Sequence, residues 1–181
     1  MFSTFFSPTI ILISAFFYAL SFGLNSFLLE SFTYSLGVAW IFLPAGLRLL
    51  LTLLFAQSGA VGIALASSII AITFYFNDLM LGLAAGITSG LAPYIARYLA
   101  LKDMGLTESL ANLDGSKLLN CIFIYSLISP ILHQTLFTVA DPKNDFFDNL
   151  GVMIIGDLMG SMIVIYCAKA LIYLVKKSKW V

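Results

Sequence analysis

The chain has 181 residues, of which 61% are hydrophobic and 10% are charged, and its formal net charge is zero. Its mean hydropathy of +1.03 excludes a protein that faces water on all sides, because too few polar side chains are present to cover its surface. The composition predicts an integral membrane protein in a lipid bilayer. No basic patch is interleaved with aromatic residues, so nucleic acid is not an expected partner.

Apolar runs of about 20 residues recur along the whole sequence, and each is long enough to cross a bilayer as a helix. They predict one all-α membrane domain over residues 1–181, a bundle of about six transmembrane helices. The expected spans cover about residues 7–28, 36–56, 59–76, 79–101, 118–139 and 150–175. The period-two alternation of membrane β-strands is absent from these runs.

The short loops predict the orientation of the bundle. The connection between the fourth and fifth spans carries Arg97, Lys102 and Lys117, and lysines 176, 177 and 179 follow the sixth span. The loop "DPKNDFFDN" between the fifth and sixth spans contains a single lysine and three aspartates. The positive-inside rule therefore places the N- and C-termini in the cytoplasm.

Small residues and prolines mark expected helix contacts and bends. Glycines four residues apart flatten one side of a helix and let another backbone approach, which indicates packing faces in the fourth and sixth spans. These glycines are Gly82, Gly86 and Gly90 in the fourth span and Gly156 and Gly160 in the sixth. Prolines inside spans remove a backbone hydrogen bond and predict kinks at Pro44, Pro93 and Pro130.

One charge lies deep in an apolar run. Arg48 follows Pro44 by one turn in "WIFLPAGLRLLLTLLF", about 18 Å from the expected start of that span. Asp157 lies about 10 Å into the sixth span from the same side. A lone charge in lipid is costly, so Arg48 is expected to bond to Asp157 across the interior, directly or through a polar group of the fifth span. Such a pair serves as a ligand or ion site, as a latch, or as a structural tie alone.

The fifth span supplies further polar candidates. In "SLISPILHQTLF", Ser129, His133 and Gln134 surround Pro130, and His133 is the only histidine of the chain. It lies about six residues from the expected periplasmic end, which favours contact with water at the headgroup level. The sequence contains no catalytic motif and no metal-ligand spacing, which predicts neither an enzyme nor a metal site, and no cofactor is indicated.

Four segments in order, "FLPAGLRLLLTLLF", "GAVGIALAS", "SGLAPYIARYLALKDMGLTESLANL" and "IIGDLMGSMIVIYCAKAL", resemble the membrane-associated sensor domain (MASE) of bacterial signalling proteins, first type. The likeness covers about residues 39–171. The family's proline-alanine-glycine and glycine-aspartate-x-x-glycine motifs are matched by Pro44, Ala45 and Gly46 and by Gly156, Asp157 and Gly160. The resemblance implies a sensor in the bacterial inner membrane.

Family members have more helices than the six expected here, and they continue into a kinase or cyclase output domain. Phe42 also replaces a tryptophan typical of the family, with Trp40 two positions earlier. The expected function is therefore a stand-alone sensor-like module that binds a small ligand or a partner and passes the signal to a separate protein.

Two alternatives stay open. The size and the expected helix count also resemble the substrate-capture subunits of energy-coupling-factor transporters, for which Ala15 and Ala19 would form the docking face. The chain would otherwise be an accessory structural subunit of a larger membrane complex. In each case the expected partner is another membrane protein or a second copy of the chain.

Overall fold

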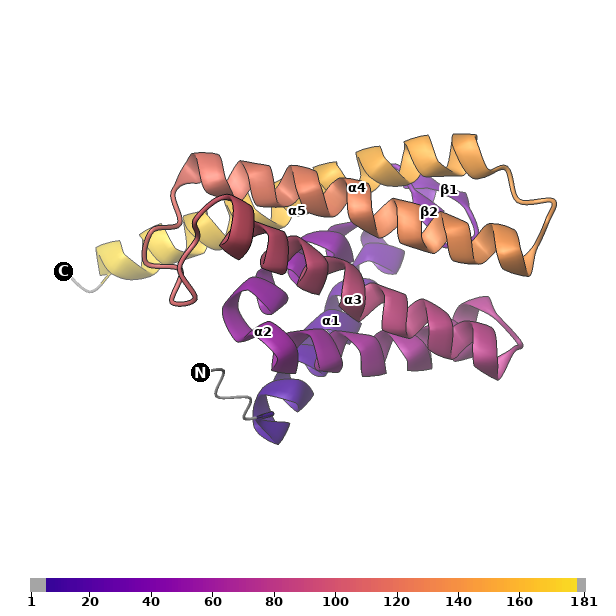
Figure 1. Ribbon diagram of the computed structural model, residues 1–181, viewed down its shortest axis with the longest axis horizontal. Helices are drawn as coiled ribbons and strands as arrows, with labels where there is room; N and C mark the ends of the chain where they lie inside the picture. Colours follow the sequence, from indigo (N-terminus) through magenta and orange to yellow (C-terminus); the bar gives the residue numbers. More distant parts are fainter. Residues whose placement is uncertain (1–5, 179–181) are drawn as a thin grey trace.

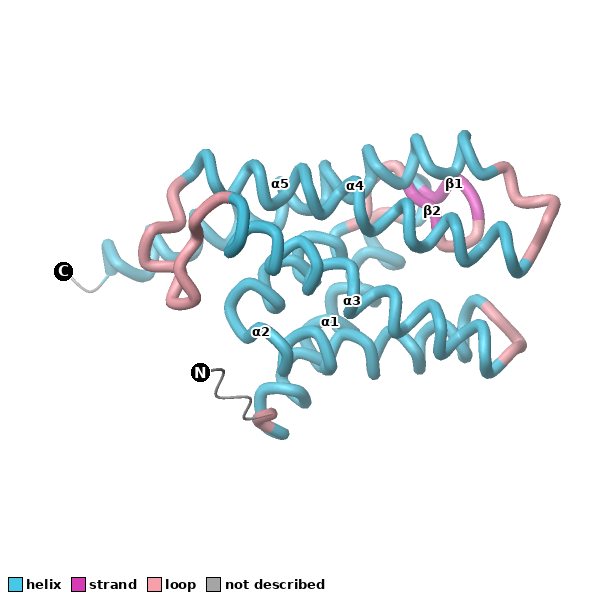
Figure 2. Tube along the Cα trace, in the orientation of Figure 1, coloured by secondary structure: helices cyan, strands magenta, loops and turns pink. Residues whose placement is uncertain are grey.

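The computed structural model describes residues 6–178, which are almost entirely helical (Figures 1 and 2). The five helices are α1 (Pro8–Leu28), α2 (Leu43–Ile70), α3 (Leu79–Asp103), α4 (Gly115–Ala140) and α5 (Phe146–Ser178). Between α1 and α2 lie the 3-10 turn η1 (Glu30–Phe32) and the strands β1 (Thr33–Ser35) and β2 (Val38–Ala39). A π-helical turn, η2 (Ala71–Tyr75), extends α2.

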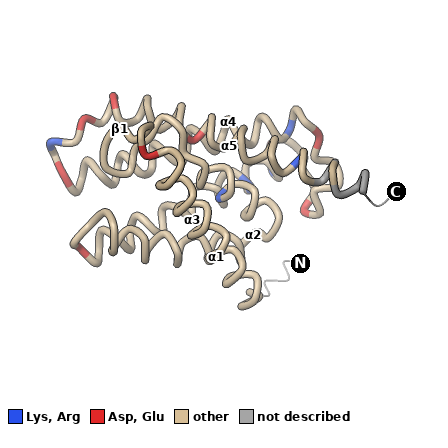
Figure 3. Tube along the Cα trace, turned by 180° about the vertical axis from the view of Figure 1, so that it is seen from behind, with Lys and Arg blue, Asp and Glu red and all other residues tan. Residues whose placement is uncertain are grey.

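All five helices are long and apolar enough to cross a membrane. Large apolar side chains such as Phe16, Ile69 and Ile87 are exposed on the outside of the bundle, as a protein surrounded by lipid requires. Charged residues gather mainly at the two ends of the bundle (Figure 3). The prediction of an all-α fold is thus confirmed, and its five long apolar helices are consistent with a multi-pass membrane protein.

The expected count of six helices is not confirmed, because the second and third expected spans form one interrupted helix, α2. The interruption is Ala56, whose φ of 48° and ψ of −124° are not helical. A Cβ added to Gly59 would lie 2.5 Å from the carbonyl oxygen of Leu51, so the chain turns back sharply at Ala56. The first described residues of α1 and the end of α5 lie toward the same end of the bundle (Figure 1), and their cytoplasmic location stays a prediction.

The residues before Leu43 were expected to be helical from residue 36 but form a hairpin segment, residues 29–42. β1 and β2 pair antiparallel, and Gly37, with φ of +74°, occupies the turn between them. The N–H of Phe42 donates to the carbonyl oxygen of Gly156 at 3.1 Å. The N–H of Leu43 donates to Oδ1 of Asn25 at 2.8 Å. The side chain of Asn25 on α1 therefore supplies a partner for a backbone N–H at the start of α2 that has none within its own helix.

The N-terminus of α2 lies deep within the bundle. A Cβ on Gly156 or Gly160 would collide with the carbonyl oxygens of Ala39 and Phe42, respectively. Gly160 is about 21 Å along α5 from Phe146, so the hairpin segment reaches far into the apolar layer. Irregular backbone at that depth is tolerated only where protein buries it or where it lines a cavity.

The glycine stripe of α3 faces inward, toward α2. A Cβ at Gly82, Gly86 or Gly90 would collide with Ile72, Ser68 or Ala60, respectively. The stripe therefore packs α3 against the second part of α2 within one chain.

The prolines differ in role. Pro44 was expected to kink a span but lies in the first turn of α2, where its missing N–H costs no helical hydrogen bond. The sharp bend of this helix is at Ala56 instead. Pro93 and Pro130 lie inside α3 and α4 as expected.

Replacing Gly160 by alanine is expected to lower the free energy of unfolding by about 1–3 kcal/mol, because the new methyl group would push α5 away from the start of α2. Gly151→Ala is the matched control on the same helix, since nothing lies within 4 Å of its Cβ position. Because alanine favours helix over glycine, this control should be neutral or slightly stabilising. Thermal unfolding in detergent measures both, and equal tolerance of the two substitutions would contradict the close contact.

Candidate ligand-binding site

Arg48 lies in the first part of α2, and the packing of α2 sets the direction of its side chain. Gly46 is pressed against α5, where its Cβ position lies 2.7 Å from Cβ of Val164 and 2.8 Å from Cα of Ser161. Two residues further along a helix the direction changes by about 200°, so Arg48 leaves α2 on the side away from α5. It is buried, with 4% of its surface exposed.

The guanidinium of Arg48 contacts α1 and the hairpin segment. Its Nη2 donates to the hydroxyl of Tyr18 at 2.5 Å. Its central carbon lies 5.1 Å from the centroid of the Tyr18 ring and 5.3 Å from that of Phe42, within the range of cation–π attraction. Aromatic faces and one hydroxyl are therefore its immediate neighbours.

The expected direct bond between Arg48 and Asp157 is wrong. Asp157 is fully buried, and both of its carboxylate oxygens lack a hydrogen-bond partner among the described residues. Nε and Nη1 of Arg48 also lack partners there. The physical reason is the contact at Gly46, which turns Arg48 away from the helix that carries Asp157.

The alternative expectation was that a polar group of the fifth span links Arg48 to Asp157 indirectly. That span is α4, and it places two polar side chains near Asp157. Tyr125 and Ser129 are both buried. Tyr125 lies close enough to Arg48 and to Asp157 for electrostatic interaction, whereas Ser129 lies close to Tyr125 and Asp157. No pair among them meets hydrogen-bond geometry. The cation and the carboxylate thus influence each other across α4 without forming an ion pair.

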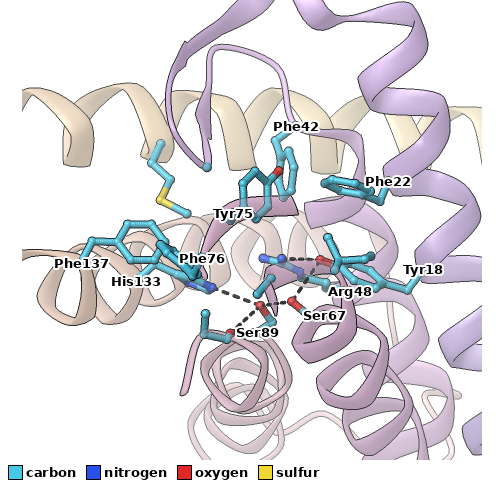
Figure 4. A pocket seen from close by; sticks show the side chains of 15 residues that line it. Tyr18, Phe22, Phe42, Arg48, Ser67, Tyr75, Phe76, Ser89, His133 and Phe137 are labelled. Atoms are coloured by element: carbon cyan, nitrogen blue, oxygen red, sulfur yellow. Dashed lines mark hydrogen bonds between the residues drawn. The ribbon is translucent and has the colours of Figure 1, made fainter. Parts of the chain in front are cut away.

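A chain of hydrogen bonds runs from Arg48 through four helices (Figure 4). The Tyr18 hydroxyl, which accepts from Arg48, donates to Oγ of Ser67 at 3.4 Å, and Ser67 donates to Oγ of Ser89 at 2.8 Å. Ser89 donates to the carbonyl oxygen of Ala85 at 2.9 Å and also lies 3.1 Å from Nε2 of His133. These bonds join α1, both parts of α2, α3 and α4. The side chains that they connect are called the polar centre below, and they are Tyr18, Arg48, Ser67, Ser89 and His133.

His133 was expected at the headgroup level, and that expectation is wrong. The side chain is buried, with 4% of its surface exposed, and Phe137 packs edge-on at 6.0 Å between ring centroids. Its Nδ1 lies 2.8 Å from the carbonyl oxygen of Ser129. Because a carbonyl only accepts, Nδ1 carries a proton. In a neutral ring Nε2 is then an acceptor, and the single hydroxyl proton of Ser89 bonds either to Nε2 or to the carbonyl oxygen of Ala85. Phe76 and Phe137 cover the ring on its outer side (Figure 4).

The remaining candidates of the fifth span lie elsewhere. Gln134 is fully buried, donates to Sδ of Met153 at 3.5 Å and accepts from Asn144 at 3.0 Å, so it ties α4 to α5 and to their connecting loop. Ser129 faces the region of Asp157 rather than the polar centre around Ser89. Among the five ligand candidates predicted from the sequence, Arg48 and His133 share a cavity.

This inner cavity has a volume of about 40 Å³, which is room for about three water molecules. Besides Arg48 and His133, the polar side chains that line it are Tyr18, Ser67, Tyr75 and Ser89. Sequence reasoning missed these four hydroxyls, although each interrupts an apolar run. The rest of the lining is mostly aromatic, from Phe22, Phe42, Phe76 and Phe137.

A larger outer cavity adjoins the inner one. Its volume is about 1080 Å³, and it lies between α1, the hairpin segment and the C-terminal end of α2. The two cavities share five lining residues, Phe22, Gly37, Phe42, Ile70 and Tyr75. Those residues therefore form a neck between a wide apolar space and a narrow polar one.

Comparisons with protein-family models, curated proteins and solved structures found no match for this chain. No relative therefore supplies a ligand or a partner, and the chemistry of the site rests on its own residues. A buried cation with free donors, several hydroxyls and an imidazole form a polar end that suits a small negatively charged or strongly polar group.

Two buried tyrosines provide a matched test of the polar centre. Tyr18→Phe removes the acceptor of a charge-assisted hydrogen bond and should lower the free energy of unfolding by about 1.5–3 kcal/mol. Tyr125→Phe removes a buried hydroxyl that has no hydrogen-bond partner, so it should be neutral or stabilising. Chemical unfolding in detergent compares the two variants, and a larger loss for Tyr125→Phe would refute the assigned bonding of Arg48.

Proposed function

We propose that the chain is an integral membrane module that binds a small ligand at Arg48 and passes the binding event to a separate membrane protein. The observation that carries this proposal is the state of Arg48. It is a permanent cation, buried at the end of a two-part cavity, with two of its three nitrogens free of partners among the described residues. A purely structural arginine in lipid is expected to be paired.

The backbone around the cavity supports the same proposal. The hairpin segment brings non-helical chain deep into the apolar layer, where it lines both cavities through Gly37 and Phe42. Membrane proteins tolerate such irregular backbone where protein buries it or where it lines a water-filled cavity. The hairpin segment thus lacks regular helical hydrogen bonds next to the guanidinium of Arg48.

Four helices meet at the polar centre, which gives a bound ligand a way to change the arrangement of the bundle. The hydrogen-bond chain connects α1, α2, α3 and α4, so a ligand that contacts Arg48 changes bonds in all four helices. Ala56 gives α2 a sharp break between Arg48 and Ser67. Movement of the two parts of α2 relative to each other is the proposed response, and the resemblance to a bacterial sensor domain favours a partner in the bacterial inner membrane.

A substrate-capture subunit of an energy-coupling-factor transporter would use the same cavity but has less support. Its expected docking face on α1 is not a free stripe. Ala15 is half-buried against α2, where its backbone nitrogen lies 3.1 Å from the Cβ position of Gly62, while Ala19 lines the outer cavity. Uptake that requires a coupling complex would favour this alternative.

An accessory structural subunit is the other alternative. A bulky substitution in the glycine stripe of α3, such as Gly86→Leu, does not test this role, because Gly86 contacts Ser68 of the same chain and its replacement would disrupt the chain itself. The absence of any small ligand, together with a fixed stoichiometry with larger proteins, would favour this role.

The proposal predicts that the chain copurifies with a small molecule, which native mass spectrometry in mild detergent detects as a one-to-one complex. Arg48→Gln should lose at least about 90% of the bound ligand, because it removes a charge-assisted hydrogen bond worth more than a tenfold change in affinity.

Arg97→Gln is the matched control. Arg97 lies on α3, outside both cavities, and bonds to the backbone oxygens of Leu53 and Glu108. This variant should keep the ligand. Wild-type protein that carries no small molecule, or an Arg48 variant that binds it as well as wild type, would overturn the proposal.

A further inference from the structure

We infer that the ligand is an amphipathic monoanion, a carboxylate-sized head group on an apolar chain or ring, with the head at Arg48 and the apolar body in the outer cavity. This inference rests on the proposed function and names the chemical class that the same site would take.

The shapes of the two cavities set the shape of the ligand. The inner cavity of about 40 Å³ holds only one small group, whereas the outer cavity of about 1080 Å³ holds a much larger body. The neck between them, formed in part by Phe22, Phe42 and Tyr75, is aromatic. A molecule that fills both spaces has a small end and a larger apolar end.

The charges set the sign of the small end. Arg48 is the one charged residue that lines the inner cavity in the described part of the chain. Glu30, the carboxylate of the outer cavity, is exposed in the turn η1 and does not line the inner cavity. The N-terminus of α2, at Leu43, adds a partial positive charge beside the neck. An anionic head is therefore attracted inward and a cationic one is repelled.

The linings set the chemistry of each part. Tyr18, Ser67 and Ser89 surround the head position with hydroxyls, which donate to carboxylate oxygens and donate to or accept from the waters around them. The outer cavity is lined mainly by apolar side chains, including Phe27, Phe74 and Leu36, of which Phe27 is 83% exposed. An apolar body entering from the lipid side of α1 meets mainly apolar side chains there.

Gly23 offers a way to block the apolar part without touching the polar part. It lines the outer cavity, and nothing lies within 4 Å of a Cβ added there. Gly23→Leu would place a side chain in the outer cavity while leaving helix packing and Arg48 unchanged. Gly151→Leu is the matched control, because Gly151 is equally open but lines neither cavity.

The test uses the full chain in lipid nanodiscs and two photoreactive probes, decanoate and decanol, each with a diazirine on the alkyl chain. Labelling of wild-type protein by the carboxylate should map by mass spectrometry to the C-terminal half of α1 and to the hairpin segment. It should exceed labelling by the alcohol by about tenfold, because the alcohol has no charge for Arg48. Gly23→Leu should lower carboxylate labelling to a similar extent, and Gly151→Leu should not.

The Arg48→Gln variant should label with the two probes equally, at the low level of decanol. Equal labelling of wild-type protein by carboxylate and alcohol would overturn the inference, as would carboxylate labelling that survives Gly23→Leu. If acetate stabilises wild-type protein but not Arg48→Gln, and decanoate fails to label the outer cavity, the binding function stands and the amphipathic class is wrong. If no carboxylate binds and no ligand copurifies, both proposals fail.

Discussion

The structure depends on the burial of one charge that cannot be neutralised. Arg48 lies within the apolar layer, so its guanidinium needs partners that lipid does not provide. Tyr18 supplies a hydrogen bond and an aromatic face, and Phe42 supplies a second face. These contacts exist only because α1 and the hairpin segment both come close to the start of α2.

α1 and the hairpin segment come close to the start of α2 for two reasons. Glycines of α5 leave space for the backbone of the hairpin segment, and the second expected span is helical only from Leu43. Gly156 and Gly160 leave space for the backbone of the hairpin segment against α5, and Asn25 caps the start of α2 from the other side. α2 therefore begins in the interior instead of at the membrane surface, and its turn at Ala56 returns the chain to complete the polar centre with Ser67. The same arrangement that solves the problem of Arg48 also forms the neck between the two cavities.

Much of the fold could be predicted from hydropathy, because apolar runs of span length have few other solutions in lipid. The ranges of α1, α3, α4 and α5 follow that signal. The hairpin segment could not be predicted in this way, since Leu36, Val38 and Trp40 are as apolar as residues of a helix. The direction of the Arg48 side chain could not be predicted from the sequence either, because it depends on which side of α2 packs against α5 and not on depth in the membrane. His133 was misplaced for a similar reason, since distance from a helix end does not reveal which aromatic side chains cover a residue.

The central claim is that Tyr18, and not Asp157, is the direct partner of Arg48. Two double-mutant cycles test it most directly, one combining Arg48→Met with Tyr18→Phe and the other combining Arg48→Met with Asp157→Asn, with the free energy of unfolding measured in detergent. The account predicts the larger coupling energy for the cycle with Tyr18, because only that pair shares a hydrogen bond. A coupling energy that is larger with Asp157 would show that the two charges form the pair that holds the interior together, and would contradict the account.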